Sequence, residues 1–320
     1  RSLLVSAAAI GSAMTAPASA QTLPASTPVE PDRQAPGFYR YKVGDLMVTA
    51  VTDGVAHRPV EGLVRNAEPG EVQGALDSAF LPRETITIPF PTLVIDRGGK
   101  LTLIDTGNGD SGAPTSGQWM ANFRAAGFDP AAVETVIISH FHGDHINGLR
   151  LKDGTAVFPG AEVLVPEAEW AFWMDDAKMA AAPEGMKGAF QNVRRVFGPI
   201  AKEEKRFAPE SEVVPNVTAV AAYGHTPGHM AFVISAGNGQ LMALSDTTNH
   251  PALFVRNPDW QAVFDIDGEM ARQTRRRLLD MVASERLQVA FYHAPFPATG
   301  HIARDGNGFA FVPVAWSPII

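Results

Sequence analysis

The feature that most constrains the fold of this chain is a histidine cluster directly after an apolar run. The stretch VIISHFHGDHING (136–148) places His140, His142, Asp144 and His145 straight after β-branched residues. Such a run is typical of a buried strand. In an extended segment, side chains two apart face the same way, so His140 and His142 can bind one ion together. Asp144 and His145 follow a turn and are displaced enough to serve a second ion.

Further candidate ligands stand at the ends of other apolar runs. VTAVAAYGH ends at His225, QLMALSD at Asp246 and LQVAFYH at His293. This recurrence predicts a metal site at one rim of packed sheets. An aspartate between two cations is chemically apt, because each carboxylate oxygen can take one metal at the ~3.5–4 Å spacing of dinuclear hydrolases. The chain has no cysteine, so His, Asp and Glu must hold any metal and disulfides are excluded.

Composition limits the class of protein. The chain has 320 residues, of which 45% are hydrophobic and 19% charged, as in globular proteins with a substantial core. The formal net charge of -8, without a dense basic run, argues against nucleic acid as a partner. The local cluster RQTRRR (272–277) is predicted to lie on the solvated face of a helix. Composition leaves open whether the chain forms a homodimer.

The N-terminal segment differs from the rest. Residues 1–20 combine an apolar, Ala-rich stretch with a small-x-small ending, which predicts a signal peptide and a periplasmic or secreted protein. The apolar run is too short and interrupted to predict a membrane span. Residues 21–36 are rich in Pro, Ser and Thr and predict a flexible leader. The catalytic domain is therefore expected over residues 37–320.

The pattern of apolar residues predicts sheets covered by helices. Residues 38–54 contain two strand-like runs around Gly44-Asp45, and Gly98-Gly99 joins two more. Helical patterns cover four segments, which are 116–127, 166–176, 184–197 and 268–283. The order predicts an α+β protein in which sheets pack together beneath helices.

The motifs resemble a known family. HFHGDH, GHTPGH, LSD and the late His are similar to those of the metallo-β-lactamase superfamily. With LIDTG, FYHAPFPATGHI and FVPV, the resemblance to the methyl parathion hydrolase and dihydrocoumarin-type lactonase branch covers nearly the whole mature chain. It implies an αββα sandwich of two mixed β-sheets packed face to face, with helices outside. It also implies one metal on His140, His142 and His225, a second on Asp144, His145 and His293, and Asp246 between them.

The resemblance implies two divalent metal ions, with zinc first and manganese, cobalt or iron as alternatives. A water shared by two such ions has its pKa lowered toward ~7, which supplies hydroxide at neutral pH. The expected reaction is attack of this hydroxide on lactones, aryl esters or related organophosphate esters. Asp144 is the expected catalytic acid, which passes a proton to the leaving group.

Three residues are expected to support ligands without touching the metals. Asp105 in LIDTG resembles the family carboxylate that orients a ligating histidine, with a simple turn aspartate as the alternative. His229, four positions after His225, is expected to pack behind the site. His301 rivals His293 as the late ligand, but His293 is preferred because it follows its strand directly.

Residues expected to touch substrate are mostly aromatic and uncharged. They favour an apolar ring or acyl group over an anionic substrate, because no Arg or Lys is identified near them. Aryl esters and aromatic lactones are then expected as the best substrates, and phosphotriesters as slower ones. The candidates are Phe90, Phe141, Trp173, Phe197 and His250.

Other functions stay open at this point. A β-lactamase is one alternative, although the absence of cysteine excludes the β-lactamases that use a Cys ligand. An iron-dependent oxidoreductase of the same superfamily is a second, and a non-catalytic binding protein a third. The Gly-x-Ser-x-Gly motif is absent, which argues against a serine hydrolase triad.

Overall fold

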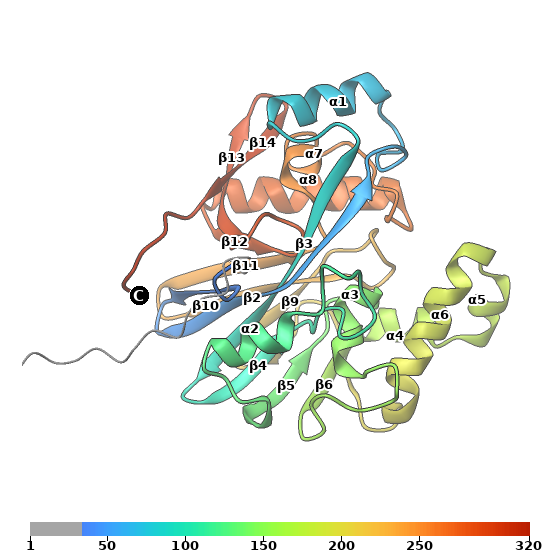
Figure 1. Cartoon of the computed structure of the whole chain (residues 1–320), viewed down its shortest axis with the longest axis vertical. Coiled ribbons are helices and arrows are strands. Elements are labelled where there is room, and N and C mark those ends of the chain that lie inside the picture. The colour runs from blue at the N-terminus through green and yellow to red at the C-terminus, as the bar shows by residue number, and fades with distance from the viewer. Residues whose placement is uncertain (1–33) are drawn as a thin grey trace, which may run out of the picture. The chain divides into compact units, whose positions relative to one another are not determined.

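A computed structural model describes residues 34–320, in which two seven-stranded sheets pack face to face (Figure 1). The first sheet is antiparallel from β1 to β4 and parallel from β4 to β7. Its strands, in spatial order, are β1 (Phe38–Val43), β2 (Leu46–Pro59), β3 (Thr85–Arg97), β4 (Lys100–Ile104), β5 (Val133–Ile137), β6 (Glu162–Pro166) and β7 (Lys205–Phe207).

The second sheet is antiparallel except for the parallel pair β11 and β12. Because β10 is antiparallel to both β9 and β11, the strands β9, β11 and β12 all run in the same direction. Their carboxyl ends therefore meet at one edge. In spatial order the strands are β14 (Gly308–Pro313), β13 (Thr299–Asp305), β12 (Gln288–Phe291), β11 (Gly239–Ser245), β10 (Met230–Ala236), β9 (Val217–Ala221) and β8 (Glu212–Val214).

Both predicted hairpins are present. The first joins β1 to β2 through Gly44, which has a φ of 59°. A Cβ at Gly44 would lie 1.9 Å from the carbonyl oxygen of Ala236, so the turn needs a residue without a side chain. The second joins β3 to β4 through Gly98 and Gly99.

Helices lie on the outer faces of the sheets (Figure 1). Buried residues of α2, α4 and α6 pack on the outer face of the first sheet, and α8 packs on the second. The helices are α1 (Pro69–Ser78), α2 (Trp119–Ala125), α3 (Gly143–Ile146), α4 (Glu167–Trp173), α5 (Asp176–Ala181), α6 (Glu184–Phe197), α7 (Pro251–Phe254) and α8 (Gly268–Ser284). Short 3-10 turns occupy Pro130–Ala132, Asn147–Leu149 and Gly198–Ile200.

The inner faces of the two sheets form the central core. Central strands such as β3, β4 and β11 are buried in nearly continuous runs, because the other sheet covers one face and helices cover the other. This core joins Ile95, Ile137 and Leu164 of the first sheet to Phe232 and Ile234 of the second. A separate apolar cluster beneath α1 packs the far ends of β2 and β3 against α7. The predicted αββα sandwich is confirmed.

The helices differ from the prediction in several places. The segment 166–176 ends as a helix at Trp173, and α5 begins anew at Asp176, because Asp175 caps it by accepting from the amide of Lys178. The segment 116–127 is helical only from Trp119 to Ala125. Sequence patterns did not predict four short helices, which are α1, α3, α5 and α7.

The arginine cluster in α8 is not wholly solvated, so that prediction was wrong for one residue. The side chain of Arg275 is only 1% exposed. Its guanidinium donates to the carbonyl oxygens of Thr247 and Pro258 and to the carboxylate of Asp265. These acceptors compensate the cost of burying the charge.

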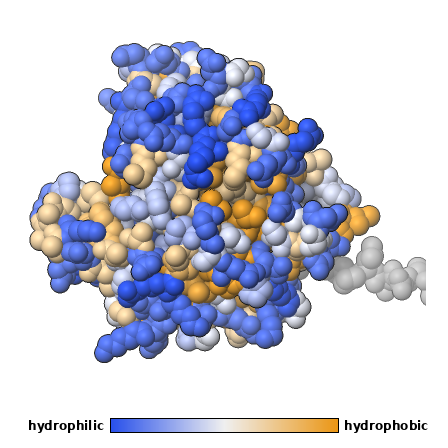
Figure 2. Space-filling view, turned by 180° about the vertical axis from the view of Figure 1, so that it is seen from behind, coloured by the Kyte–Doolittle hydropathy of each residue, from blue (hydrophilic) through white to orange (hydrophobic). Residues whose placement is uncertain are grey.

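Hydrophilic residues cover most of the rear face, and hydrophobic ones gather in a smaller central area (Figure 2). Among residues 34–320, no helix has the length and apolar character needed to cross a membrane. The expected signal peptide, and the expected leader up to residue 33, lie outside the described residues.

Candidate metal centre

The seven candidate ligands meet at one edge of the sandwich because their strands end there. His140, His142, Asp144 and His145 follow β5 in the first sheet. The ligands from the second sheet follow β9, β11 and β12, which run in the same direction. These ligands are His225, Asp246 and His293.

Three imidazoles form the first group, which consists of His140, His142 and His225. The Nε2 atom of His140 lies 3.1 Å from Nδ1 of His142, and Nε2 of His225 lies 2.9 Å from the same Nδ1. Two nitrogens that bind one tetrahedral zinc at ~2.0–2.1 Å are about 3.3 Å apart. The three nitrogens are thus spaced as ligands of a common ion.

Asp144, His145 and His293 form the second group. Oδ2 of Asp144 lies 3.6 Å from Nε2 of His145 and 3.6 Å from Nε2 of His293. The imidazoles of His145 and His293 are buried, whereas the side chain of Asp144 is 23% exposed. Asp144 is therefore the most exposed member of this group.

Asp246 stands between the two groups. Its Oδ2 lies 3.3 Å from Nε2 of His225 and 3.0 Å from Nε2 of His293, while its Oδ1 lies 3.3 Å from Nε2 of His145. Nε2 of His145 and Oδ1 of Asp246 are buried without any hydrogen-bond partner. A buried polar atom without a partner is costly, and a cation at this point would satisfy both atoms.

The donor set therefore fits two divalent ions. Imidazole nitrogens and carboxylate oxygens suit zinc and other divalent first-row metals. The residues offer one group of three imidazoles, a second group of two imidazoles and a carboxylate, and one carboxylate within reach of both.

A hydrogen-bond network behind the second group orients His145. Nδ1 of His145 donates to Oδ2 of Asp105 at 2.8 Å. The same carboxylate accepts from the amide and the hydroxyl of Ser139. The contact fixes which nitrogen of His145 faces the site. Asp105 thus lies where a carboxylate that orients a ligand is expected.

Asp265 supports His225 and was missed by sequence reasoning. Nδ1 of His225 donates to Oδ1 of Asp265 at 2.9 Å, and Oδ2 of Asp265 accepts from the buried guanidinium of Arg275 at 3.1 Å. The residues come from separate segments, 40 and 10 positions apart. No local motif marks Asp265, although a histidine that binds metal calls for such a partner.

The remaining imidazoles also have partners. Nδ1 of His293 lies 2.9 Å from the carbonyl oxygen of Pro89, which receives its proton. Nδ1 of His229 donates to the carbonyl oxygen of Ala222, and its Nε2 accepts from the amide of Asp246. His229 is buried and lies behind Asp246, as expected of a residue that supports the site.

Glu169 joins the two loops that carry the first group. Its Oε2 accepts from the amide of Phe141 and from Nε1 of Trp173, and its Oε1 accepts from the amide of Gly228. Phe141 lies between two candidate ligands, and Gly228 follows His225 by three positions. A Cβ on Gly228 would lie 2.3 Å from the amide nitrogen of Glu169, so the loop needs glycine there.

Burial and neighbouring carboxylates shape the electrostatics of the site. Burial lowers the pKa of His140 and of His142 well below 6.5. Burial also opposes protonation of His145, but Asp246 and Asp144 raise its pKa well above 6.5. The carboxylates thus favour positive charge at the centre of the cluster.

Two residues beside the site adopt a strained backbone. Asp105 directly follows β4 with a φ of 63°, and Ser245 precedes Asp246 with a φ of 47°. Residues other than glycine adopt this left-handed region at a cost of about 1–3 kcal/mol. Hydrogen bonds compensate part of that cost, since the hydroxyl of Ser245 donates to that of Ser139, which contacts Asp105.

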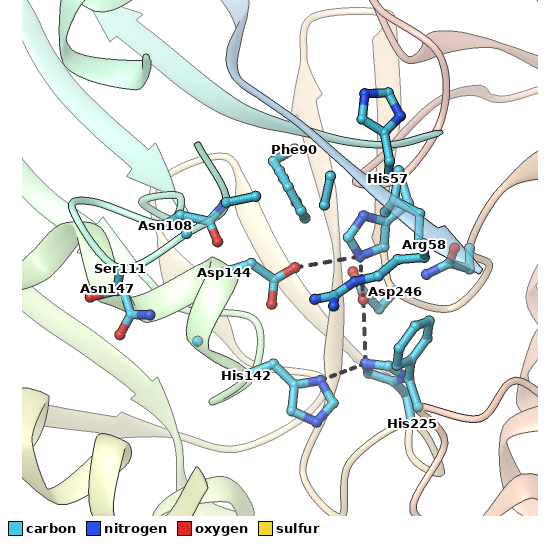
Figure 3. Close-up of a pocket in the computed structure, with 18 residues that line it drawn as sticks. His57, Arg58, Phe90, Asn108, Ser111, His142, Asp144, Asn147, His225 and Asp246 are labelled. Atoms are coloured by element: carbon cyan, nitrogen blue, oxygen red, sulfur yellow. Dashed lines mark hydrogen bonds and ion pairs between the residues drawn. The ribbon is translucent and has the colours of Figure 1, made fainter. Parts of the chain in front are cut away.

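A pocket of about 580 Å³ opens over the cluster (Figure 3). His142, Asp144, His225, Asp246 and His293 form its floor. The rest of its lining is Ala56, His57, Arg58, Ile88, Phe90, Asn108, Ser111, Gly112, Ala113, Gly143, Asn147, Asn249 and Phe264. The presence of Arg58 contradicts the expectation of a pocket without a nearby Arg or Lys.

Of the five residues expected to touch substrate, Phe90 alone lines this pocket. Phe141 and Phe197 stack in the core with ring centroids 4.3 Å apart. Trp173 is also buried, and its ring lies behind His142 with centroids 6.3 Å apart. His250 caps α7 by accepting from the amide of Ala252. These four side chains do not line the pocket, because apolar packing holds three of them and helix capping holds His250.

His301 does not support the site either. It is exposed on β13, and its Nδ1 lies 3.1 Å from the carbonyl oxygen of Leu287. His293, the preferred late histidine, lies in the cluster. The expectation for His301 was wrong because an outward position on a strand leaves its side chain in solvent.

Comparisons with known proteins find lactonases among the relatives of this chain. An N-acyl homoserine lactonase of a Bacillus species is 22% identical over 238 residues, which cover 68% of this chain and 86% of that protein. The N-acyl homoserine lactonase AttM of Agrobacterium fabrum is 25% identical over 197 residues, which cover 57% of this chain and 70% of that protein.

Solved structures show the same fold. AidC, a dizinc quorum-quenching lactonase in complex with a product, is 26% identical with a TM-score of 0.83, and the match covers 88% of this chain and 98% of AidC. The hydrolase AbOPH is 24% identical with a TM-score of 0.83, and the match covers 89% of this chain and all of that one. Residues 91–293, more than half of the chain, match the model of one family. The chain belongs to the metallo-beta-lactamase superfamily.

Proposed function

We propose that this chain is a metal-dependent hydrolase that opens lactones. The observation that carries the proposal is the position of Asp246, whose carboxylate lies within 3.3 Å of ligands in both groups. The similarity to lactonases, including a dizinc enzyme, supports lactones as the substrate class. We propose zinc as the metal, bound as two ions per chain.

Each part of the site has a role in this proposal. His140, His142 and His225 would hold one ion and Asp144, His145 and His293 the other, with Asp246 within reach of both groups. When bound, divalent ions supply a nucleophile near neutral pH and stabilise the negative charge that develops on the carbonyl oxygen.

The chain itself orients the substrate and moves one proton. Phe90 and Ile88 form an apolar wall beside the ligands, against which the apolar part of a lactone can pack. Asp144 borders the pocket and is partly exposed, so its carboxylate can pass a proton to the leaving oxygen when the ring opens. Aryl esters are proposed as further substrates and organophosphate triesters as slower ones, because the same nucleophile can attack them.

A substrate panel tests the proposal. The zinc-loaded chain is assayed with γ- and δ-lactones, an N-acyl homoserine lactone, an aryl ester, a phosphotriester and a chromogenic cephalosporin. We expect a lactone to have the highest kcat/KM. Faster turnover of the cephalosporin than of every ester and lactone contradicts the proposal and favours a β-lactamase. Oxygen consumption by the iron-loaded chain, without lactone hydrolysis, favours an oxidoreductase.

A further inference from the structure

Arg58 is the one Lys or Arg among the residues that line the pocket in the described part of the chain. It lies in the far part of β2, where it pairs with β3. Residues opposite one another in an antiparallel pair project from the same face, and side chains alternate along a strand. Arg58 therefore shares a face with Ala56, Ile88 and Phe90, which line the pocket.

The side chain of Arg58 reaches into the space above the ligands. In the view of Figure 3 it projects across Asp246 toward Asp144, whereas the ring of its neighbour His57 points away. The imidazole of His57 already has a hydrogen-bond partner on the other face of the sheet, because its Nδ1 lies 3.1 Å from the hydroxyl of Thr87. Of these two neighbours, Arg58 is the one positioned to meet a molecule in the pocket.

Within residues 34–320, the guanidinium of Arg58 has no hydrogen-bond acceptor and no carboxylate within ion-pair distance. The two carboxylates of the pocket, those of Asp144 and Asp246, both belong to the proposed ligand set. Bound divalent ions would neutralise the negative charges of these two carboxylates. Arg58 then remains a cation without a counter-charge beside an already positive centre, which favours an anionic substrate.

We infer that Arg58 binds a carboxylate of the substrate, and that the preferred substrates are lactones that bear a free carboxylate away from the ring ester. This inference rests on the proposed function. The planar guanidinium can donate two parallel hydrogen bonds to a carboxylate. A single cation matches a monoanion better than a doubly charged phosphate. The ring ester would then lie over the metals while the carboxylate contacts Arg58.

The test uses two γ-lactones that differ in one group, a carboxylate in one and the neutral carboxamide in the other. Wild type is compared with Arg58→Met, which keeps the length of the side chain but removes its charge. We expect Arg58→Met to lower kcat/KM for the carboxylate lactone by about 10- to 100-fold, because a hydrogen bond to a charged group is lost. The carboxamide lactone should change less than about threefold. Arg58→Lys should lose less than Arg58→Met, because it keeps the charge.

Arg124→Met is the matched control. Arg124 is an exposed arginine of α2 that does not line the pocket, so its loss should leave the ratio between the two lactones unchanged. A wild-type enzyme without preference for the carboxylate lactone overturns the inference and leaves the proposed function standing. So does an Arg58→Met variant that loses both activities equally.

A binding measurement decides the inference even if no lactone is cleaved. A carboxylate-bearing γ-lactam, which resists hydrolysis, is titrated into the zinc-loaded chain by calorimetry, with its carboxamide as the comparison. Binding that depends on the carboxylate and weakens at least tenfold in Arg58→Met supports the inference. Equal binding of the two lactams to wild type overturns it. Failure of all lactone cleavage overturns the proposed function separately.

Discussion

Nδ1 of His225 lies 2.9 Å from Oδ1 of Asp265. The other carboxylate oxygen accepts from the buried guanidinium of Arg275 and from the amide of Ala262, both at 3.1 Å. These contacts fix the plane of the imidazole and direct its Nε2 toward His142 and Asp246. Through Arg275 and Asp265, helix α8 thereby positions His225 at the edge of the second sheet.

Replacing Asp265 should weaken metal binding without removing a ligand. Asp265→Asn keeps the shape of the side chain but removes its charge, so we expect the affinity for zinc in the group that contains His225 to fall by about 10- to 100-fold. Competition with a fluorescent chelator measures this affinity. Asp280→Asn is the control, because Asp280 is an exposed residue of α8 that pairs with Arg304. Equal affinities in wild type and Asp265→Asn contradict the positioning role.

The buried carboxylate of Glu169 should stabilise the fold around the site. Glu169→Gln replaces one acceptor oxygen by an amide group that faces donors, so we expect a loss of about 1–3 kcal/mol in the free energy of unfolding. Urea unfolding, followed by circular dichroism, measures it. Glu167→Gln is the same substitution on an exposed residue of the same helix and should change stability little. Similar effects of both variants would show that the hydrogen bonds of Glu169 do not stabilise the fold.

The two late histidines should behave differently. His293→Ala removes a side chain that lies 3.0 Å from Asp246, so it should lose bound metal and nearly all lactone hydrolysis. His301→Ala removes an exposed side chain of β13 and should retain both. Metal content and kcat/KM of the two purified variants decide the assignment. Loss of metal in His301→Ala, with retention of metal in His293→Ala, would show that His301 rather than His293 is the ligand.

Phe197 should affect stability rather than substrate choice. Phe197→Ala leaves a cavity beside Phe141 and Trp170, which should lower the free energy of unfolding by about 3–5 kcal/mol. The ranking of substrates should stay as in wild type, whereas Phe90→Ala, which changes the pocket wall, should alter it. Thermal unfolding and the substrate panel measure the two effects. An altered ranking in Phe197→Ala with unchanged stability contradicts the assignment of Phe197 to the core.

The sequence allowed the fold and the ligand cluster to be predicted because both depend on local patterns. His140, His142, Asp144 and His145 fall in one motif, and His293 directly follows an apolar strand. Strand direction then brings these ends together. Periodicity of apolar residues likewise predicted α6 within its observed bounds.

Residues that act through long-range contacts could not be predicted in this way. Asp265 supports His225 although the two residues are 40 positions apart in the sequence. The register between β2 and β3 determines which face of the sheet Arg58 projects from, and this face borders the pocket. Aromatic residues were misplaced for a related reason. Side chains such as Trp173 suit a core and a pocket equally well, and only packing decides between them.

The central claim is that Asp246 joins two metal sites in one hydrolase, and metal content tests it most directly. Active wild-type protein, dialysed against metal-free buffer, is analysed for zinc and other divalent metals per chain alongside Asp246→Ala. We predict about two metals per chain in wild type and depletion of both sites in Asp246→Ala, because the shared carboxylate is lost. A single tightly bound metal in fully active wild-type protein would contradict the claim.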